Sequence, residues 1–409
     1  MKKLLILLLL ATMILSGCEL NINSNDPDVK NWTLMTQSAK GTVVTIAIEH
    51  SNPAVLEWFR KDFASTLKLK HEIELVVVDQ NILKTLDQLN QEKANEVEMG
   101  SIDLIYIESE GFKSAMEKSL LYGPFSDKLP NAELYFEPKD TNYASRDGIS
   151  ANYHMIPVSR KQLSMIYNQD VFYEKPESYD ALIEIIKTYK GGFTYPDPRT
   201  SIEGQAFVLS VLGQYLDFDV FKSGTLDKNK YLDAIKPGIE DLVAMKPYLM
   251  DGGATYPQSM EALDAVFREG KAIMSLSMDY NYVTDRLREY EYPEGASTFV
   301  IPAGMATFNE VAAIAFNAPN KSGAMVVLNE LLTPEVQTLK YNPRNWGSLP
   351  PYSKNLVDTT KLEAFKDVKL KSTTVKLSEF IEASMPEFSP EMIKIALLEW
   401  ENKVLGNME

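Results

Sequence analysis

The chain has 409 residues, of which 45% are hydrophobic and 24% are charged, so it holds enough apolar material for well-buried cores. This composition excludes wholesale disorder, collagen-like repeats and a disulfide-stapled miniprotein. A single cysteine permits no internal disulfide, and three histidines are too few for a Cys/His zinc cluster, so we expect neither a metal nor a cofactor. The formal charge of -16 repels phosphate backbones, and we expect no nucleic-acid partner.

The first eighteen residues have the pattern of an export signal. Two lysines precede an apolar run from Leu4 to Leu15, which is shorter than the roughly twenty residues that a membrane-spanning helix needs. The run ends in Leu15-Ser-Gly-Cys18, which resembles the lipobox of bacterial lipoproteins, where the cysteine becomes lipidated. This predicts a signal peptide over residues 1–17, a tether over 18–40, and attachment through Cys18 to the extracytoplasmic face of the cell membrane. The alternative is an ordinary secretory peptide with a chance cysteine.

From Thr42 the chain repeats a short apolar strand, a turn and an amphipathic helix, which is typical of a largely parallel sheet covered by helices. In the first unit, Asn52 is a good N-cap, and Val55, Phe59 and Phe63 recur on one helical face. The predicted strands of the first three units cover residues 42–48, 73–78 and 102–107. Residues 122–150 lack periodicity and predict a connecting loop with a domain boundary.

The second half of the chain alternates shorter apolar stretches with helical patterns. Further strands are predicted over residues 162–167, 192–196, 271–277, 298–301 and 310–316. Helices are predicted over residues 179–189, 201–216, 232–249 and 260–269, from about 322, and through most of the last sixty residues.

Two stretches, residues 155–167 and 299–316, are predicted to cross between two α/β lobes. The first lobe then comprises residues 41–155 and 305–409, and the second comprises 156–304. Because ligands of open parallel sheets bind beyond the carboxyl ends of the strands, a ligand cleft is expected between the lobes.

Several segments of the sequence resemble segments of the solute-binding lipoproteins of bacterial ABC importers. The resemblance is to a subgroup related to the thiamine, polyamine and iron binders. The segments are Gly100–Ile107, Gly111-Phe112, Leu121–Asn131, Phe193–Pro198 with Gly204 and Phe207, Ala315–Val327 and Leu332–Gln337. The resemblance covers most of the chain from about Gly41 to Trp346. It implies a two-lobed type II periplasmic-binding-protein fold with mostly parallel sheets, and a solute delivered to a membrane permease.

Two departures from the family pattern leave the identity of the solute open. Relatives tend to have Trp-Gly-Gly after the first strand, where this chain has Ile48-Glu-His50. Relatives also tend to have Asn-Gly-Glu where this chain has Glu108-Ser-Glu110.

Four predicted helix starts, after Asn52, Ser109, Ser201 and Asp279, present free backbone N–H groups that bind anionic groups. The alternative is simple capping of each helix. Glu108, Glu110 and Asp279 add negative charge that favours a cationic group, and their alternative role is to complement the helix dipole.

Aromatic side chains provide flat faces for rings and cations, and Tyr195, Tyr280, Tyr282 and Trp346 are placed near the predicted cleft, although plain packing is the alternative. The predicted solute-binding residues are His50, Ser51, Asn52, Glu108, Ser109, Glu110, Tyr195, Ser201, Asp279, Tyr280, Asn281 and Trp346. Arg160 and Lys161, near the first crossing, either hold an anion or form a solvated basic pair.

No hydrolase elbow, zinc-protease motif, P-loop or dinucleotide fingerprint is present, so no catalytic residue is predicted. We therefore expect a monomeric, lipid-anchored receptor whose partners are a small polar organic solute, cationic or zwitterionic, and an ABC permease. One alternative is a cell-surface hydrolase of carbohydrate or peptide that uses Glu108 and Asp279 as an acid/base pair. Another is an adhesive or scaffolding lipoprotein with an exposed apolar patch.

Overall fold

β1 (Val43–Ile48) lies inside a six-stranded sheet, where Val44 and the residues from Ile46 to Ile48 are buried, while Val43 at its start is exposed. The strand order is β2-β1-β3-β11-β4, with β7 paired to β11 as well. The other strands of this sheet are β2 (Glu74–Asp79), β3 (Leu104–Ile107), β4 (Leu121–Tyr122), β7 (Ile156–Gln162) and β11 (Thr307–Ala315).

In this computed structural model, residues 31–406 are described, apart from Ser109, Pro138, Thr141, Lys222, Ser223 and Thr359. The predicted signal peptide, Cys18 and Ser109 therefore lie outside the described residues.

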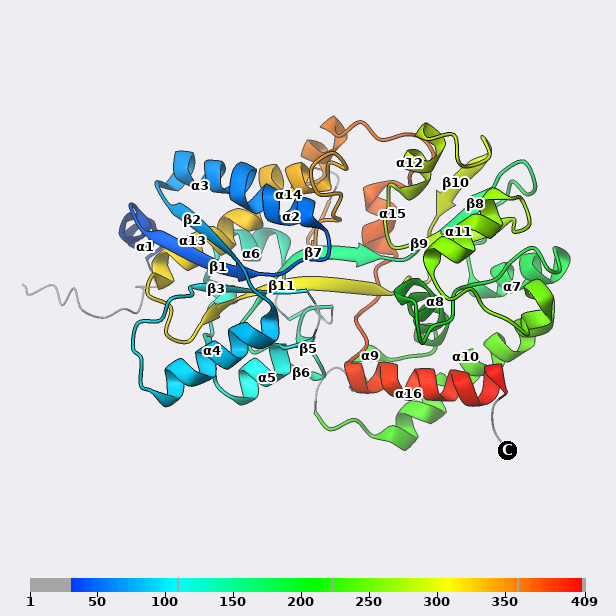
Figure 1. The fold of residues 1–409 in the computed structure, drawn as a ribbon, viewed down its shortest axis with the longest axis horizontal. Helices are drawn as coiled ribbons and strands as arrows, with labels where there is room; N and C mark the ends of the chain where they lie inside the picture. The colour runs from blue at the N-terminus through cyan, green and yellow to red at the C-terminus, as the bar shows by residue number, and fades with distance from the viewer. Residues whose placement is uncertain are drawn as a thin grey trace, which may run out of the picture.

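The helices that cover this sheet complete lobe one, and its core contains side chains of β1, β3, β7 and β11 (Figure 1). α2 and α3 are joined by a π-helical turn, Phe59–Phe63, so that Val55, Phe59 and Phe63 share one buried face as predicted. Asn52 caps α2, and Asn81 caps α4. The helices are α1 (Trp32–Ala39), α2 (Pro53–Trp58), α3 (Ala64–His71), α4 (Ile82–Ala94), α5 (Phe112–Glu117), α6 (Pro130–Tyr135), α13 (Lys321–Leu331) and α14 (Pro334–Tyr341).

Lobe two is built around a three-stranded antiparallel sheet of order β10-β8-β9. α8 is apolar around most of its circumference and is accordingly buried, with Phe207 fully enclosed in the core. The strands are β8 (Ser164–Asn168), β9 (Met274–Ser277) and β10 (Ala296–Phe299). The helices are α7 (Tyr179–Thr188), α8 (Ile202–Gly213), α9 (Phe218–Phe221), α10 (Lys228–Met245), α11 (Met260–Arg268), α12 (Tyr282–Arg288), α15 (Leu377–Glu382) and α16 (Pro390–Trp400).

Smaller elements complete the described chain. A hairpin of β5 (Ser145–Arg146) and β6 (Ile149–Ser150) lies on the side of lobe one that faces α16 (Figure 1). Single 3-10 or π turns cover Ser126–Lys128, Lys246–Tyr248, Met250–Gly253, Glu363–Asp367 and Glu401–Leu405. No helix among the described residues is long and apolar enough to cross a bilayer.

β7 and β11 form an antiparallel ladder that runs from one lobe to the other (Figure 1). Their partners extend from Thr307 with Gln162 to Ala312 with Ile156, with a register shift between Glu310 and Val311. The C-terminal segment is tied to the same strands, because the N–H of Arg160 donates to the carbonyl of Leu349 at 3.0 Å. The lobes are thus joined by backbone ladders and not by flexible linkers.

The structure corrects three expectations from the sequence. Only the pairings of β1 with β2 and β3 are parallel among the described strands, so the sheets are mixed and not mostly parallel. From Tyr341 onward the apolar side chains pack mainly into the core of lobe two, so residues 305–409 do not belong to lobe one as a whole. Residues 192–196 form no ladder, and 122–150 contain α6 and the β5–β6 hairpin.

Phe207→Ala is expected to lower the free energy of unfolding by about 3–5 kcal/mol, because it leaves a cavity in the core of lobe two. Urea denaturation followed by circular dichroism measures this loss. The control, Leu398→Ala, truncates a side chain that is 47% exposed and should change stability by no more than about 0.5 kcal/mol. Equal effects of the two substitutions would contradict the assignment of this core.

Candidate functional site

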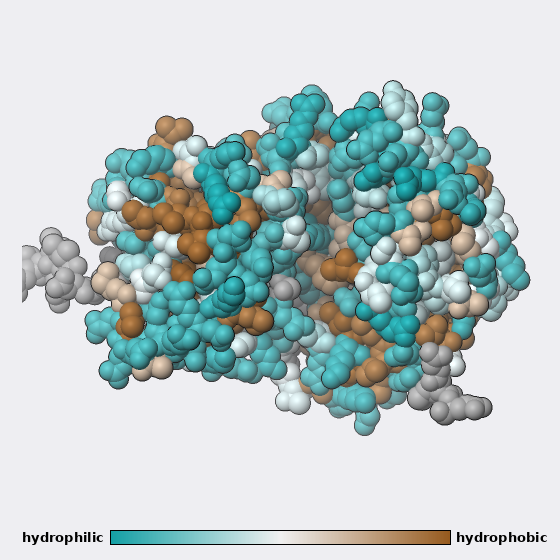
Figure 2. All heavy atoms as spheres, viewed as in Figure 1, coloured by the Kyte–Doolittle hydropathy of each residue, from teal (hydrophilic) through white to brown (hydrophobic). Residues whose placement is uncertain are grey.

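A cavity of about 310 Å³ lies where the lobes meet, and Figure 2 shows the surface hollowed between the two halves. Lobe one and the crossing strands supply most of its charged side chains, and lobe two supplies most of its apolar ones. Its lining consists of Glu108, Glu110, Ser145, Arg146, Asp147, Gly148, Lys161, Ile202, Gln205, Phe218, Phe221, Phe308, Glu310, Pro386, Glu387, Phe388, Ser389, Pro390, Met392 and Ile393.

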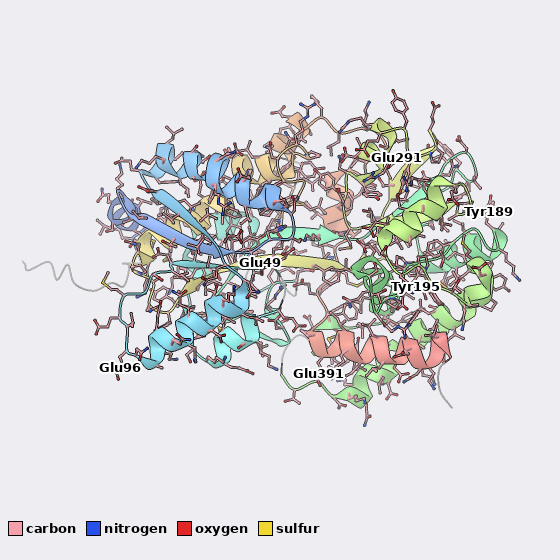
Figure 3. The ribbon with its side chains drawn as sticks, in the orientation of Figure 1. Glu49, Glu96, Tyr189, Tyr195, Glu291 and Glu391 are labelled. Atoms are coloured by element: carbon pink, nitrogen blue, oxygen red, sulfur yellow. The ribbon has the colours of Figure 1, made fainter. Side chains whose placement is uncertain are left out.

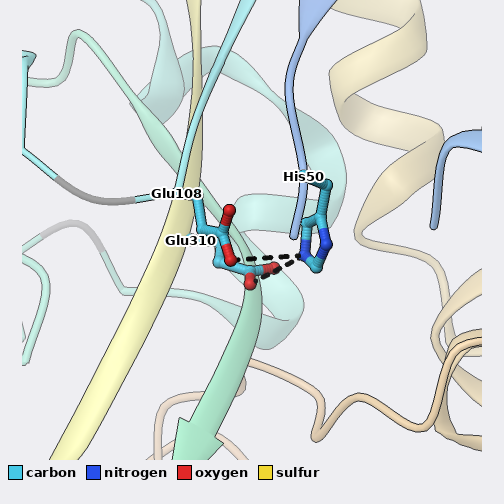
Figure 4. A group of neighbouring side chains, drawn as sticks. All are labelled: His50, Glu108 and Glu310. Carbon is cyan, nitrogen blue, oxygen red and sulfur yellow. Dashed lines mark hydrogen bonds and ion pairs between the residues drawn. The ribbon is translucent and has the colours of Figure 1, made fainter. Parts of the chain in front are cut away.

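The buried carboxylate of Glu310 lies at the base of this cavity, next to the register shift in β11. His50, just after β1, lies 3.1 Å from Glu310, measured from Nε2 to Oε1 (Figure 4). The hydroxyl groups of Tyr106 on β3 and Ser159 on β7 both donate to Oε2 of Glu310. Burial alone would raise the pKa of Glu310, but the bond from His50 and the charge of Lys161 lower it well below 4.5. Glu310 is therefore an ionised carboxylate held by donors from β3, from β7 and from the segment that follows β1.

Lys161 on β7 links Glu310 to the second carboxylate of the site, Glu108. Its Nζ lies 2.9 Å from Oε1 of Glu108 and 3.1 Å from Oε1 of Glu310. Ser51 adds a bond from its hydroxyl to Glu108 at 2.9 Å. Burial favours a raised pKa for Glu108, but the bond and the charge of Lys161 outweigh burial and lower the pKa. The cluster already contains one ammonium group shared by two carboxylates.

His50, Glu108 and Glu310 bring one nitrogen and two carboxylate oxygens within 4.8 Å of one another, a spacing that suits a metal ion. The hydrogen bonds do not fit that role. Nδ1 of His50 accepts from the N–H of Asn52 at 2.9 Å, so the proton of the neutral ring lies on Nε2. A metal ligand must offer a lone pair, whereas Nε2 directs a proton at Glu310. In this arrangement His50 is a donor to Glu310.

A second polar contact joins the lobes at the rim of the cavity. Arg146 of the β5–β6 hairpin donates from Nη1 to Oε2 of Glu387 at 2.9 Å and to the carbonyl of Asn309 at 2.7 Å. The N–H of Asn309 donates to Oε1 of the same Glu387 at 2.6 Å. Glu387 follows α15 and packs with lobe two, so this network connects lobe one, a crossing strand and lobe two.

Several predicted solute-binding residues lie in or beside the cavity. Glu108 and Glu110 line it, and Ser51 and His50 contact Glu108 or Glu310. Trp346 packs edge-on against the ring of His50, with 6.0 Å between ring centroids. Asn52 caps α2 and orients the ring of His50 through its N–H. Their role in binding a solute stays a prediction.

The structure corrects the prediction for Tyr195 and Tyr280. Tyr195 lies in lobe two (Figure 3) and is fully buried there. Its hydroxyl accepts a bond of 2.9 Å from Nε1 of Trp400. Tyr280 is buried and stacked on Tyr341, with 4.9 Å between centroids, and its hydroxyl donates to the carbonyl of Tyr341. Both rings are used for packing, the alternative that the sequence left open.

The remaining predicted residues of lobe two do not line the cavity either. Ser201 is buried and donates its hydroxyl to Glu203 at 2.6 Å, although its neighbour Ile202 does line the cavity. Asp279 accepts from the N–H of Asn281, whose side chain bonds to Asp285 at 3.0 Å. Because Asp279 is not beside Glu108 in this cavity, the structure does not bring together the predicted acid/base pair.

Sequence reasoning missed Arg146, Glu310 and Glu387 as site residues, and it named Lys161 only as a residue that could hold an anion. Glu310 carried a usable signal, because a charged residue in an apolar strand is rare unless it is paired. The expected solvated pair is wrong, since Arg160 is buried and Lys161 is bonded to carboxylates. No local pattern marks Glu387, which is brought to the cavity by the course of the C-terminal segment.

Behind the cluster, Lys340 on α14 is completely buried. Its Nζ donates to the carbonyl of Val158 and to Oε1 of Gln337 at 3.2 Å, and lies 4.5 Å from the ring centre of Trp346. Burial lowers the pKa of Lys340 from 10.5 to about 7, and the charge of Glu310 opposes this change.

Lys340 should make the stability of the protein depend on pH between about 7 and 10.5. In this range the unfolded lysine binds a proton that the folded lysine does not, so stability falls as the pH is lowered towards 7. Lys340→Met should reduce the slope by up to about 1.4 kcal/mol per pH unit, as measured by urea denaturation. The control Lys236→Met replaces an exposed lysine and should keep the wild-type slope. A slope unchanged in Lys340→Met would contradict the lowered pKa.

Tyr195→Phe should lower the free energy of unfolding by about 1–3 kcal/mol, because the buried N–H of Trp400 loses its acceptor. Thermal unfolding measures the loss, and calorimetric titration should show no change in solute affinity. Tyr173→Phe, at a position that is 81% exposed, should change neither quantity. A loss of affinity without a loss of stability would restore Tyr195 as a binding residue.

Comparison with known proteins agrees with this architecture. Residues 58–370 match the model of the bacterial extracellular solute-binding protein family. Protein YnjB of Escherichia coli K12 is 25% identical over 322 residues, which cover 78% of this chain and 81% of YnjB.

Solved structures share the fold at low sequence identity. A candidate extracellular solute-binding protein of Bordetella parapertussis superposes with a TM-score of 0.62 at 11% identity, covering 88% of this chain and 98% of the other. The cyclic alpha-maltosyl-1,6-maltose binding protein of Arthrobacter globiformis gives 0.60 at 16% identity, covering 89% and 98%. The spermidine/putrescine substrate-binding protein PotD of Streptococcus pneumoniae gives 0.52 at 14% identity, covering 88% and 99%. Because the family model spans well over half of its length, this chain belongs to the bacterial extracellular solute-binding proteins and has their type II periplasmic-binding-protein fold.

Proposed function

We propose that this protein is the substrate-binding component of an ABC import system and captures a small cationic or zwitterionic organic solute. One observation carries the choice of solute: five carboxylates line the cavity between the lobes, against two cationic side chains. The carboxylates are those of Glu108, Glu110, Asp147, Glu310 and Glu387, and the cations are Arg146 and Lys161. An excess of negative charge in a partly enclosed site attracts cations and disfavours anions.

The fold alone does not choose the solute. Similar structures include one named for a cyclic maltose derivative and one named for spermidine and putrescine. The charge of the cavity favours a cationic ligand over an uncharged sugar. The lining of this chain, and not its resemblance to a relative, therefore supports a cationic solute.

Capture by lobe closure follows from how the lobes are connected. A solute in the cavity touches lining residues of both lobes, and it therefore binds the closed arrangement more tightly than the open one. β7 and β11 are continuous between the lobes and can act as the hinge. The closed receptor then delivers the solute to a membrane permease. It acts as a monomer and is anchored through lipid on Cys18 at the extracytoplasmic face of the membrane.

The test begins with native mass spectrometry of the full chain, purified gently in mild detergent, to identify a bound solute. Adding this solute to stripped protein should decrease the radius of gyration in X-ray scattering and raise the melting temperature. A tight solute that leaves the radius of gyration unchanged would contradict capture by closure.

Glu108→Gln should weaken binding of this solute about tenfold or more, because it removes one negative charge from the cavity. Calorimetric titration measures the affinity. Glu98→Gln removes the same charge from an exposed position outside the cavity lining and serves as the matched control. If the two variants bind alike, the carboxylates of the cavity do not select the solute.

A further inference from the structure

The two walls of the interlobe cavity differ in chemistry. Lobe one contributes only charged, hydroxyl or glycine residues: Glu108, Glu110, Ser145, Arg146, Asp147 and Gly148. Lobe two contributes a mostly apolar wall: Ile202, Phe218, Phe221, Pro386, Phe388, Pro390, Met392 and Ile393. Figure 2 shows hydrophobic residues on the lobe-two side of the hollow. A solute between these walls meets charge on one side and hydrocarbon on the other.

Most charges of the lobe-one wall are already paired within the protein. Lys161 is shared by Glu108 and Glu310, and Arg146 is bonded to Glu387. Among the described residues, Glu110 is exposed and has neither an ion pair nor a hydrogen bond. It lines both this cavity and a second one beside α5. One carboxylate is therefore left to face a cation of the solute.

The apolar wall is formed before any solute arrives. Phe218 and Phe388 pack edge-on with 5.2 Å between their centroids, which fixes the rings that line the cavity. Ile202, at the first turn of α8, is 47% exposed. A hydrophilic solute would displace water from this wall but would offer no hydrocarbon to contact it. The apolar part of a solute would instead bury its own surface and that of the wall, and this burial lowers the free energy of binding.

We infer that the solute is an amphipathic amine, with a protonated nitrogen facing the acidic wall of lobe one and an apolar ring or branched chain against lobe two. This inference rests on the proposed function and narrows its solute class. The cavity of about 310 Å³ is at the small end of ligand pockets, which span roughly 300–1,000 Å³, and accommodates a body of about one ring. Sugars carry hydroxyl groups around the ring, and linear polyamines carry a charge at each end of the methylene chain, so neither presents an apolar ring or branched chain to lobe two.

The test compares four probes on the stripped full chain by calorimetric titration: phenethylammonium, 1,4-diaminobutane, 3-phenylpropionate and 2-phenylethanol. They separate the contribution of the charge from that of the ring. Phenethylammonium is expected to bind at least tenfold more tightly than the other three. Tighter binding of 1,4-diaminobutane, or no binding of phenethylammonium at millimolar concentration, would overturn the inference.

A pair of variants isolates the apolar wall. Ile202→Ser should weaken phenethylammonium binding severalfold and leave any weak binding of 1,4-diaminobutane unchanged. Leu398→Ser, at a position equally exposed but outside the cavity lining, should change neither. Equal binding by Ile202→Ser and wild type would overturn the inference.

The two proposals fail in different ways. A hydrophilic cation that binds tightly and compacts the protein overturns the amphipathic solute but keeps the receptor function. If neither the probes nor a copurified solute compacts the protein, the receptor function fails and the inference fails with it.

Discussion

The arrangement of the site depends on a negative charge placed inside the protein, at the point where the chain crosses between lobes. A buried carboxylate costs several kcal/mol in lost hydration unless donors replace the water. Glu310 on β11 meets this requirement with His50 after β1, Tyr106 on β3, and Ser159 and Lys161 on β7. One charge thus fixes three neighbouring segments relative to β11. It also holds Lys161 within reach of Glu108, which sets the electrostatics of the cavity above it.

The lobes differ in how they use the two crossing strands. β11 is central in the sheet of lobe one, between β3 and β4, and also pairs with β7. On the other side, the C-terminal segment ties these strands to the core of lobe two through Leu349 and Glu387. If the lobes move relative to one another, β7 and β11 must therefore bend while they keep the backbone hydrogen bonds of their ladder. The contact between Arg146 and Glu387 spans the lobes directly and is the part of this network nearest the cavity.

The sequence predicts local elements well where periodicity is strong and long-range pairing poorly. The strand at residues 42–48, the helix at 179–189 and the helix at 260–269 are found within two residues of their predicted ends. The predicted parallel pairing is confirmed for β1 with β2 and β3 and is wrong for the other described strands, because apolar runs such as those of β8 and β9 do not reveal whether a partner is parallel. The C-terminal residues were assigned to the wrong lobe, because the sequence does not show which of two cores a large side chain enters. Tyr341 and Trp400 would be buried in the core of either lobe, and the structure places them in lobe two.

The site was predictable in part, for a related reason. Glu108 and Glu110 follow a buried strand, so their place at the sheet end could be inferred from order along the chain. Tyr195 also lies in a stretch predicted as a strand, but it is buried in the core of lobe two. No feature of the neighbouring sequence distinguishes a tyrosine that faces a cavity from one that packs against Trp400. Arg146 and Glu387 are 241 residues apart, and only the assembled fold brings them together.

The position of β11 also bears on the order in which the protein acquires its structure during synthesis. The ribosome makes β1, β2 and β3 more than 190 residues before it makes the strand that joins β3 to β4 and β7. Until then the growing chain exposes an incomplete sheet, with the edge of β3 unpaired and its apolar faces uncovered by α13. The sheet of lobe one can therefore be completed only after most of the polypeptide has been made.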